Sequence, residues 1–122
     1  MKYVCSRLNI ADEKCLIDTT PSIPASQTIR MTGQMLVDSK ELAFLYALDC
    51  DEHYHYIVFY RETWPVLKEI NEKQMPLYLS VNEREMELTH FHSEFTYLLT
   101  NIQDNPNYGE QMNEEVERVF FK

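Results

Sequence analysis

The sequence predicts an α+β fold, and three features of the chain lead to that prediction. Apolar residues alternate with polar ones through most of the chain before residue 61, which is the period of a half-buried strand. After residue 61 the apolar residues recur every three or four positions, which is the period of an amphipathic helix. The clearest helical stripe runs from Phe91 to Ile102. We expect a mainly antiparallel sheet of five to seven strands with two or three helices, the last two C-terminal and packed on one face.

One domain is expected over residues 1–122. In a chain of 122 residues, two separate cores would each be marginal. The chain has 44% hydrophobic and 12% aromatic residues, which is enough apolar surface for one core.

The first twenty residues are expected to form a hairpin. Strands are predicted over 3–10 and 14–20, because Val4, Leu8 and Ile10 recur at even spacing on one face. Two prolines follow this hairpin, and proline cannot donate a hydrogen bond to a strand ladder. The segment after residue 20 is therefore expected to be a loop or an extended crossing.

Three further strands are predicted in the middle of the chain. In residues 29–37 the odd-numbered positions, including Gly33, form one face and the even-numbered positions the other. Residues 42–48 are apolar on both faces, as in a strand that is covered on both sides. Residues 53–60 are rich in aromatic and β-branched side chains and follow an acidic turn, which indicates an antiparallel partner.

A short helix is predicted over residues 63–72. Thr63 is a suitable N-cap residue, and Pro65 falls in the first turn, where its missing N–H costs nothing. Apolar residues then alternate again over 77–81 and 86–88, which predicts a second hairpin with a charged outer side.

Two C-terminal helices complete the prediction. The first begins after Thr89 as its N-cap, and the polar segment 105–109 ends it. The second is marked by the apolar residues Met112, Val116, Val119 and Phe120, and its other faces carry glutamates from Glu110 onward. The apolar stripe of the first of these helices consists of Phe91, Phe95, Leu98, Leu99 and Ile102.

The charge of the chain excludes several classes of partner. With 11 basic and 20 acidic side chains the net charge is −9, which opposes binding to nucleic acid and to anionic lipid. Residues 83–122 hold nine acidic and three basic side chains. A solvated surface is the expected interpretation, and the alternatives are a basic protein partner or mimicry of a phosphate backbone. The N-terminus lacks an apolar signal core and no apolar run reaches the ~18 residues of a membrane helix, so we expect a cytoplasmic protein.

Familiar catalytic motifs are absent from the sequence. Gly33 and Gly109 are the only glycines, so the glycine-rich loops that bind phosphate cannot form. Cys5, Cys15 and Cys50 show no CxxC spacing and are expected to be free, buried or half-buried thiols. Carboxylates beside Cys50 disfavour its thiolate. We predict no catalytic residue and no cofactor.

Two His-x-His triplets hold all four histidines. His53 and His55 lie on one side of a predicted strand and could share a divalent metal, but a partly exposed strand face is the favoured interpretation. His90 and His92 diverge in a helical first turn, which places them at the surface. We therefore assign no metal site.

Two other features have a structural and a functional interpretation. Glu83, Glu85 and Glu87 resemble a catalytic cluster only by number, because an alternating strand directs them to solvent. Trp64, the only tryptophan, is expected to cover the sheet edge, with anchoring of a partner as the alternative.

Short motifs along the chain resemble a known family. They are Gly33 to Ser39 (GQMLVDS), Glu62-Thr63-Trp64, Glu87-Leu88-Thr89 with Phe91-His92, and Asn107-Tyr108-Gly109. In this order and spacing, over residues 33–119, the chain resembles the YjbL-like family of small uncharacterised proteins of Bacillus, Staphylococcus and their relatives. The resemblance implies a bacterial cytoplasmic protein and no known activity. His92 fits the family pattern whereas the other histidines do not, which further disfavours a metal site.

Three functional hypotheses follow from these features. The leading one is a noncatalytic interaction or regulatory protein whose acidic surface meets a basic protein partner. The rival is a metal-dependent enzyme or small-ligand binder with a site between the sheet and the late helices. The third is a homo-oligomer, formed through an exposed edge strand or the terminal helix. The residues expected to converge in the rival site are Tyr54, Tyr56, His53, His55, Arg61 and Glu62.

Overall fold

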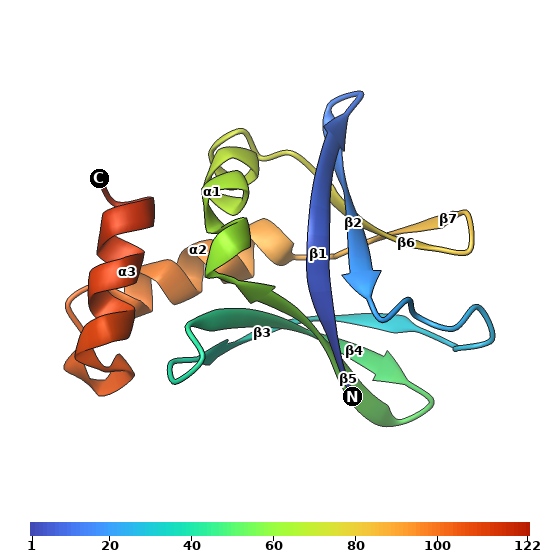
Figure 1. Ribbon diagram of the computed structural model, residues 1–122, viewed down its shortest axis with the longest axis horizontal. Helices are drawn as coiled ribbons and strands as arrows, with labels where there is room; N and C mark the ends of the chain where they lie inside the picture. Colours follow the sequence, from blue (N-terminus) through green and yellow to red (C-terminus); the bar gives the residue numbers. More distant parts are fainter.

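Seven strands form one curled sheet in the computed structural model, which describes all 122 residues (Figure 1). The strands are β1 (Lys2–Ala11), β2 (Lys14–Thr20), β3 (Arg30–Asp38), β4 (Ala43–Cys50), β5 (His53–Tyr60), β6 (Leu77–Val81) and β7 (Arg84–Glu87). Their order across the sheet is β3-β4-β5-β1-β2-β6-β7. The predicted number of strands is confirmed. The sheet is mixed, since β1 runs parallel to β5 and β2 parallel to β6, while the other pairs are antiparallel.

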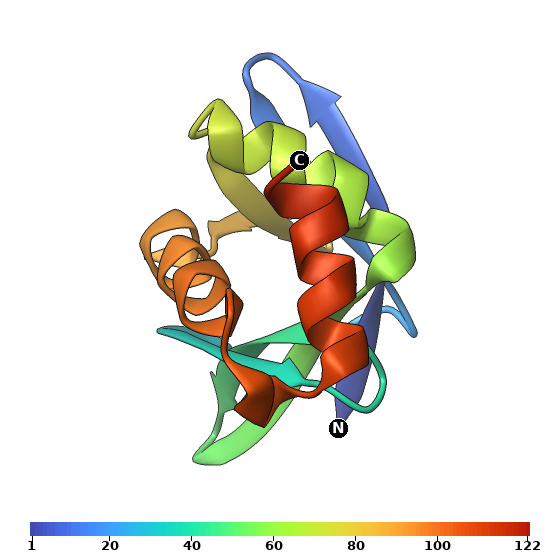
Figure 2. The same cartoon turned by 90° about the vertical axis from the view of Figure 1, so that its left-hand side faces the viewer.

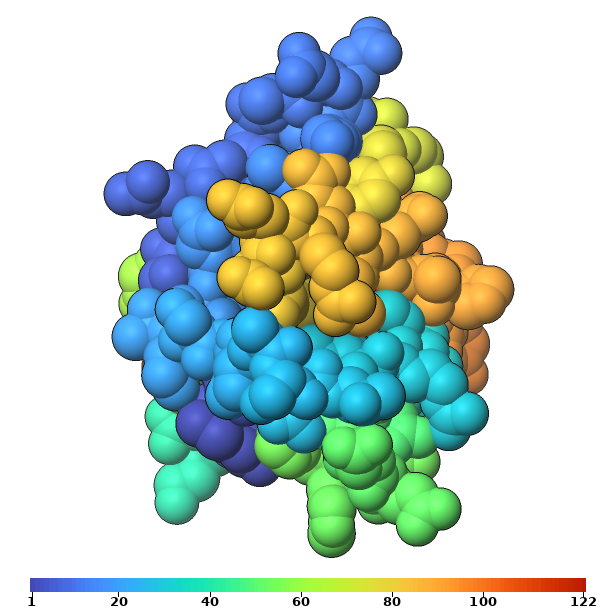
Figure 3. Space-filling model, turned by 90° about the vertical axis from the view of Figure 1, so that its right-hand side faces the viewer, coloured from blue at the N-terminus to red at the C-terminus, as the bar shows by residue number.

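Three helices lie on one side of the sheet. They are α1 (Trp64–Glu72), α2 (Phe91–Ile102) and α3 (Glu110–Phe120), with 3-10 turns η1 (Arg61–Thr63) and η2 (Pro106–Tyr108). Figure 2 shows the helices in front of the strands, with α3 in contact with both α1 and α2. Figure 3 shows the opposite end of the molecule, where strands and their connecting loops form most of the visible surface and residues of the α2 region appear at the right margin. The α+β class with two C-terminal helices is therefore confirmed, and none of these helices has the length and apolar content to cross a bilayer.

Both predicted threonine caps differ from the structure. The Thr63 hydroxyl donates backwards to the carbonyl oxygen of Tyr60 (2.8 Å) and caps no N–H of α1. The N-cap of α2 is His90, in the left-handed conformation (φ +61°), and not Thr89. The Thr89 carbonyl instead accepts a hydrogen bond from the Tyr46 hydroxyl (2.8 Å), which ties the start of α2 to β4. The helices exist where predicted because their apolar stripes are buried, and the caps contribute less.

A bulge in β1 changes which residues face the core. The register shifts by one residue between Cys5 and Arg7. Before the bulge, Tyr3 and Cys5 are buried, whereas after it Leu8 packs against the core. The prediction that Val4 shares a face with Leu8 was therefore wrong, because one extra residue exchanges the two faces of a strand.

A wider bulge in β3 surrounds Gly33. Between Met31 and Met35, β3 holds two residues more than β4, so the predicted alternation stays in phase. Gly33 has φ +73°, a left-handed conformation that favours glycine. A Cβ at this position would lie 2.9 Å from the His90 ring. The bulge therefore gives the start of α2 room to approach β3, whose free edge α2 covers.

The main core lies between the concave side of the sheet and the three helices. Aromatic rings from both layers meet there: Phe44 of β4 lies 5.1 Å from Trp64 and 4.9 Å from Phe95, between ring centroids. Trp64 is fully buried, and its Nε1 donates to the carbonyl oxygen of Phe59 (3.2 Å). Trp64 therefore packs on the interior strands β4 and β5 and not at the sheet edge where it was expected, and the alternative of an exposed partner anchor was wrong.

A second, smaller cluster lies on the other side of the sheet. Ala43, Leu45 and Val58 are buried there, and the rings of Tyr56 and Tyr60 pack against them. The prediction that residues 42–48 are covered on both sides is therefore confirmed. Helices cover one side, and the tyrosine rings pack on the other.

Candidate functional site

The largest depression of the surface lies where α2 and α3 meet. It has a volume of 380 Å³. Its lining residues are Asp104, Pro106, Asn113, Glu114 and Glu117, so it is polar and acidic. We call the three carboxylates of this set, Asp104, Glu114 and Glu117, the acidic hollow.

Local geometry brings these carboxylates together. Asp104 follows the end of α2 in a left-handed conformation (φ +59°), and Gly109 (φ +91°) precedes α3. The Asn113 side chain donates to the carbonyl oxygen of Ile102 (2.6 Å), which also accepts from the Asn105 N–H (3.0 Å), and this bond ties α3 to the end of α2. The break between the helices thus folds α3 back, so that Asp104 and the two α3 glutamates line one hollow.

The acidic hollow carries uncompensated negative charge. Its neighbour Glu115 forms both ion pairs of α3, with Arg61 (3.7 Å) and Arg118 (2.6 Å). None of the three carboxylates of the hollow forms an ion pair within the chain. No basic side chain lines the hollow. The site is therefore suited to accept lysine or arginine side chains of another molecule.

Two smaller depressions are also polar. One, of 300 Å³, lies beside the ion pair of Arg30 with Asp49 (2.5 Å). The other, of 210 Å³, lies between β2, the loop that follows it and the β6–β7 turn, with Ser22, Ser80 and Asn82 among its lining residues. Asp18 and Thr19 also line the second depression, but Asp18 accepts from the Asn9 side chain and the Thr19 hydroxyl donates to the Pro21 carbonyl oxygen, so no hydroxyl there is hydrogen-bonded to a carboxylate.

The paired histidines of β5 lie on the inner side of the sheet. His53 is exposed, and the His55 ring stacks on Tyr3 with 6.0 Å between centroids. His55 Nδ1 is buried without a hydrogen-bond partner. Desolvation, followed by the N-terminal amine and His53, lowers the pKa of His55, so its ring is neutral at pH 7. No group of three or more His, Cys, Asp or Glu side chains is placed to hold a metal ion.

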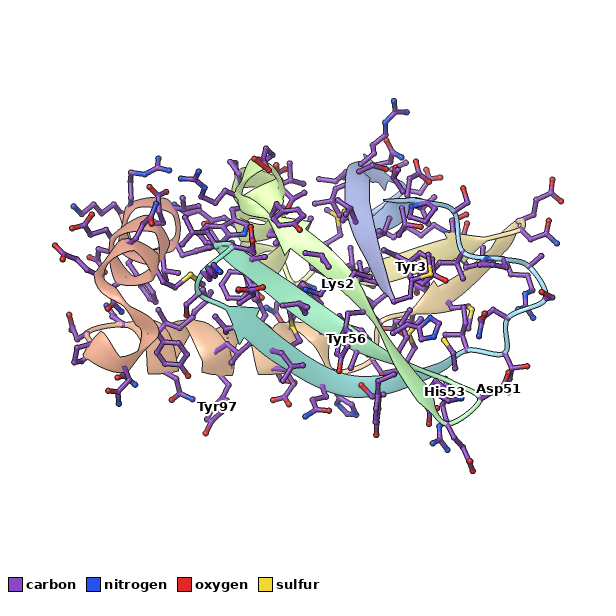
Figure 4. All side chains as sticks on the ribbon, turned by 60° about the horizontal axis from the view of Figure 1, so that its bottom comes forward. Lys2, Tyr3, Asp51, His53, Tyr56 and Tyr97 are labelled. Carbon is purple, nitrogen blue, oxygen red and sulfur yellow. The ribbon has the colours of Figure 1, made fainter.

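The rival site between sheet and helices does not form. Tyr54 and Tyr56 alternate with the two histidines and point to the other side of β5. Figure 4 labels Tyr56 and His53 well apart along β5. Arg61 lies beyond the far end of β5, where it pairs with Glu115, and Glu62 is exposed in η1. The expectation that these residues converge was wrong, because neighbours in a strand face opposite sides.

The second histidine triplet has a structural role. His90 is the left-handed N-cap of α2 and packs against Gly33. The His92 ring is half-buried, with Nδ1 2.9 Å from the Asn71 side-chain oxygen and Nε2 facing the Met75 carbonyl oxygen. His92 therefore ties α2 to the end of α1, and its expected place at the surface was wrong.

The three cysteines are free and buried, as predicted. Burial raises the pKa of Cys5 to about 12 and that of Cys15 to about 11. Burial, then Asp49 and Asp51, raise the pKa of Cys50. All three thiols are therefore protonated near neutral pH, which disfavours nucleophilic chemistry.

The glutamates of the β6–β7 hairpin face solvent, as predicted. Glu83 and Glu87 are exposed, and Glu85 pairs with Lys14 of β2 (2.5 Å). The hydrogen bond to Glu85 also raises the pKa of Lys14. These side chains therefore form the solvent-facing side of the hairpin.

Sequence reasoning identified the negative C-terminal third but not the acidic hollow within it. Asp104 and Glu114 are ten positions apart and share no periodic pattern. The available signal was the helix-breaking segment 105–109, which turns the second of two helices back upon the first.

Comparison with known proteins finds relatives of similar length. A family model described as "Family of unknown function (UPF0738)" matches residues 3–120. The chain is 44% identical to the UPF0738 protein YjbL of Bacillus subtilis (strain 168) over 89 residues, which cover 73% of each chain. It is 40% identical to a UPF0738 protein of Bacillus pumilus over 119 residues, covering 94% of this chain and 98% of the relative. A Staphylococcus aureus (strain JH9) relative is 39% identical, covering 98% and 97%. No solved structure matches the chain.

Proposed function

Because this chain belongs to the UPF0738 family, whose function is unknown, we propose a role from its own surface: a noncatalytic cytoplasmic protein that binds a basic protein partner through the acidic hollow. The family membership agrees with the YjbL-like resemblance expected from the sequence motifs. The observation that carries the proposal is the group of three carboxylates, each without an ion pair, in an open hollow that no basic side chain lines.

Two further observations support a binding role over a catalytic one. The buried thiols are protonated, and the polar residues of the rival site lie on different sides and ends of β5. The motifs shared with the family also have structural explanations in this chain: Gly33 permits the β3 bulge, Trp64 fills the core, and His92 holds α2 against the end of α1.

A pull-down with matched charge variants tests the proposal. The bait is the full chain, compared with the triple variant Asp104→Asn, Glu114→Gln, Glu117→Gln. A control variant removes the same number of charges elsewhere, at the exposed Glu52, Glu83 and Glu87, each changed to Gln. We expect a specific basic protein to be retained at about 50 mM salt and lost at about 300 mM, because salt screens exposed charges.

The variants decide where that protein binds. The hollow variant should retain at least about tenfold less of it than the wild type, and the control variant should retain it as the wild type does. If both variants lost the partner equally, binding would depend only on net charge and the proposal would be wrong. It would also be wrong if retention of the partner did not fall at high salt, or if the hollow variant retained as much of it as the wild type.

A further inference from the structure

The sheet consists of two blocks of strands that meet along a short line of contact. One block is β3-β4-β5 and the other is β1-β2-β6-β7, and within the sheet only the pairing of β5 with β1 joins them. Residues 2–4 pair in parallel with residues 56–58, and the Tyr56 N–H donates to the Met1 carbonyl oxygen (3.0 Å). We call this line of contact the seam. Figure 1 shows it where the N-terminus lies beside β5.

An unsatisfied polar atom lies at the seam. His55 Nδ1 is buried without a hydrogen-bond partner, and no other buried side-chain nitrogen or oxygen of the chain lacks one. Folded proteins satisfy nearly all such atoms, so this one requires a physical explanation. The His55 ring stacks on Tyr3 of β1, with 6.0 Å between centroids and 26° between the ring planes. The unpartnered atom therefore belongs to a side chain that β1 covers.

The groups packed around His55 offer no negative charge to a protonated ring. Burial raises the pKa of Tyr3 on β1 and the pKa of Cys50 on β4, so the phenol and the thiol stay neutral near pH 7. The loop before β3 contributes the neutral Gln27 side chain beside Cys50. His53, on the same side of β5, lies opposite Cys50. A proton on His55 thus meets neutral groups or a second imidazole.

Two carboxylates at this end of the sheet do not compensate for such a proton. Asp49 faces the other side of β4, where it pairs with Arg30 (2.5 Å). Asp51 is exposed in the β4–β5 turn. Desolvation, followed by the N-terminal amine and His53, lowers the pKa of His55, and no carboxylate raises it. The closed seam therefore favours the neutral ring.

We infer that the seam is an acid-sensitive junction, in which protonation of His55 releases residues 1–4 from β5 while the rest of the fold stays closed. The released segment is short, and only three residue pairs hold it to β5. Beyond it, β1 stays paired with β2 as far as Ala11. Opening exposes the His55 ring to water, which can solvate the charge that the closed seam excludes.

Proton linkage determines the direction of the effect. In the open seam His55 titrates near its ordinary pKa of 6.5, and in the closed seam it titrates below that value. The open state therefore binds more protons in this range, so opening becomes easier as the pH falls below 6.5. Through one such group, the equilibrium constant for opening can rise by at most about 25-fold between about pH 7 and pH 5.

Native-state hydrogen exchange, followed by NMR, measures this opening at one amide. The Tyr56 N–H reports the seam, because it donates to the Met1 carbonyl oxygen. The Cys15 N–H is the internal control, since it donates to the Pro76 carbonyl oxygen (2.9 Å) where β2 and β6, the other parallel pair, begin to meet. Rates are corrected for the pH dependence of exchange in unprotected amides. About pH 5 is the lower limit, because it lies above the ordinary pKa of Asp and Glu side chains.

We expect the protection of the Tyr56 N–H to fall about five- to 25-fold from about pH 7 to pH 5, relative to the Cys15 N–H. A relative fall below about fivefold would overturn the inference. So would an equal fall at both amides, because it would show that acid loosens the whole fold.

Two variants test the assignment to His55. His55→Phe keeps a ring against Tyr3 but cannot take up a proton, so the relative fall should disappear. His53→Gln is the matched control, because His53 is exposed and is the last of the causes that lower the pKa of His55. It should keep at least about half of the fall. A fall that persists in His55→Phe, or that disappears in His53→Gln, would contradict the assignment.

This inference is independent of the proposed function. The acidic hollow lies at the junction of α2 and α3, away from the seam. Its triple variant, which removes three negative charges, should therefore show the wild-type fall at Tyr56. Loss of the fall in that variant would make the effect one of net charge and would overturn the role of His55.

Discussion

The chemistry of single residues in this protein is governed mainly by burial. The relative exposure of Cys5 is 3% and that of Cys15 is 0%, and both thiols have raised pKa values because an apolar interior disfavours the thiolate. His55 responds to the same cause in the opposite sense: its pKa is lowered, so the ring is neutral. The residue types suggested reactive groups, and their surroundings make them unreactive.

The raised pKa of Cys5 predicts a loss of stability at alkaline pH. The unfolded chain releases this proton near the ordinary value of 9, whereas the folded chain keeps it up to about 12. Above pH 9 the unfolded state therefore binds fewer protons, and the free energy of unfolding falls as pH rises. The expected loss between pH 7 and pH 10 is about 1.4 kcal/mol for this thiol.

Urea unfolding at both pH values measures this loss. In Cys5→Ala the free energy of unfolding should fall between pH 7 and pH 10 by less than in the wild type, and the difference should equal that amount. This comparison separates the thiol from the tyrosines and lysines that titrate in the same pH range. An identical decrease in the two proteins would show that the thiol ionises equally in both states.

At the scale of elements, the contact between β3 and α2 depends on one backbone conformation. The bulge around Gly33 gives that residue a positive φ. It also places the Gly33 Cα so close to the His90 ring that there is no room for a Cβ atom. The Tyr46 hydroxyl joins the two elements, because it accepts from the Gly33 N–H (3.2 Å) and donates to the Thr89 carbonyl oxygen. A strand irregularity and a helix start are thus parts of one contact.

Alanine substitution at the two glycines separates crowding from backbone strain. Gly33→Ala and Gly109→Ala both place a Cβ on a residue with positive φ, but only the former meets a neighbour, at 2.9 Å. We expect Gly109→Ala to cost about 1 kcal/mol of unfolding free energy and Gly33→Ala about 2 to 3 kcal/mol. Denaturant midpoints measure both, and equal costs would show that the His90 ring moves aside freely.

At the scale of the whole molecule, one core joins the sheet to all three helices. The buried cluster includes residues of β1 to β6 and of α1, α2 and α3. Phe120 of α3 lies 5.6 Å from Trp64 and 6.1 Å from Phe44, between ring centroids, so the last helix packs on the first and on the sheet. This packing favours one cooperative unit over residues 1–122.

Cooperative unfolding is the corresponding prediction. Trp64 fluorescence reports the core, and far-ultraviolet circular dichroism reports the secondary structure of the whole chain. We expect the two denaturation curves to coincide, because the helices lose their buried face when the sheet opens. Separate transitions would indicate that α3 or the β6–β7 hairpin unfolds independently.

The sequence by itself determined the elements of this fold. Residues 53–60 and 77–81 form strands and Phe91–Ile102 forms a helix where apolar spacing predicted them, because that spacing is a local property of which side chains need burial. The excess of carboxylates after residue 83 was likewise visible, since charge is additive along a chain.

Only the tertiary structure decided which elements meet. The parallel pairing of β1 with β5, the bulge between Cys5 and Arg7, and the hollow that joins Asp104 to Glu114 all depend on contacts between segments. A bulge shifts faces without changing the composition of its strand, and neighbours across a sheet are chosen by the packing of the whole core. The local spacing of apolar residues therefore predicted the strands and helices. Contacts between segments far apart in the sequence decided which surfaces the folded protein presents.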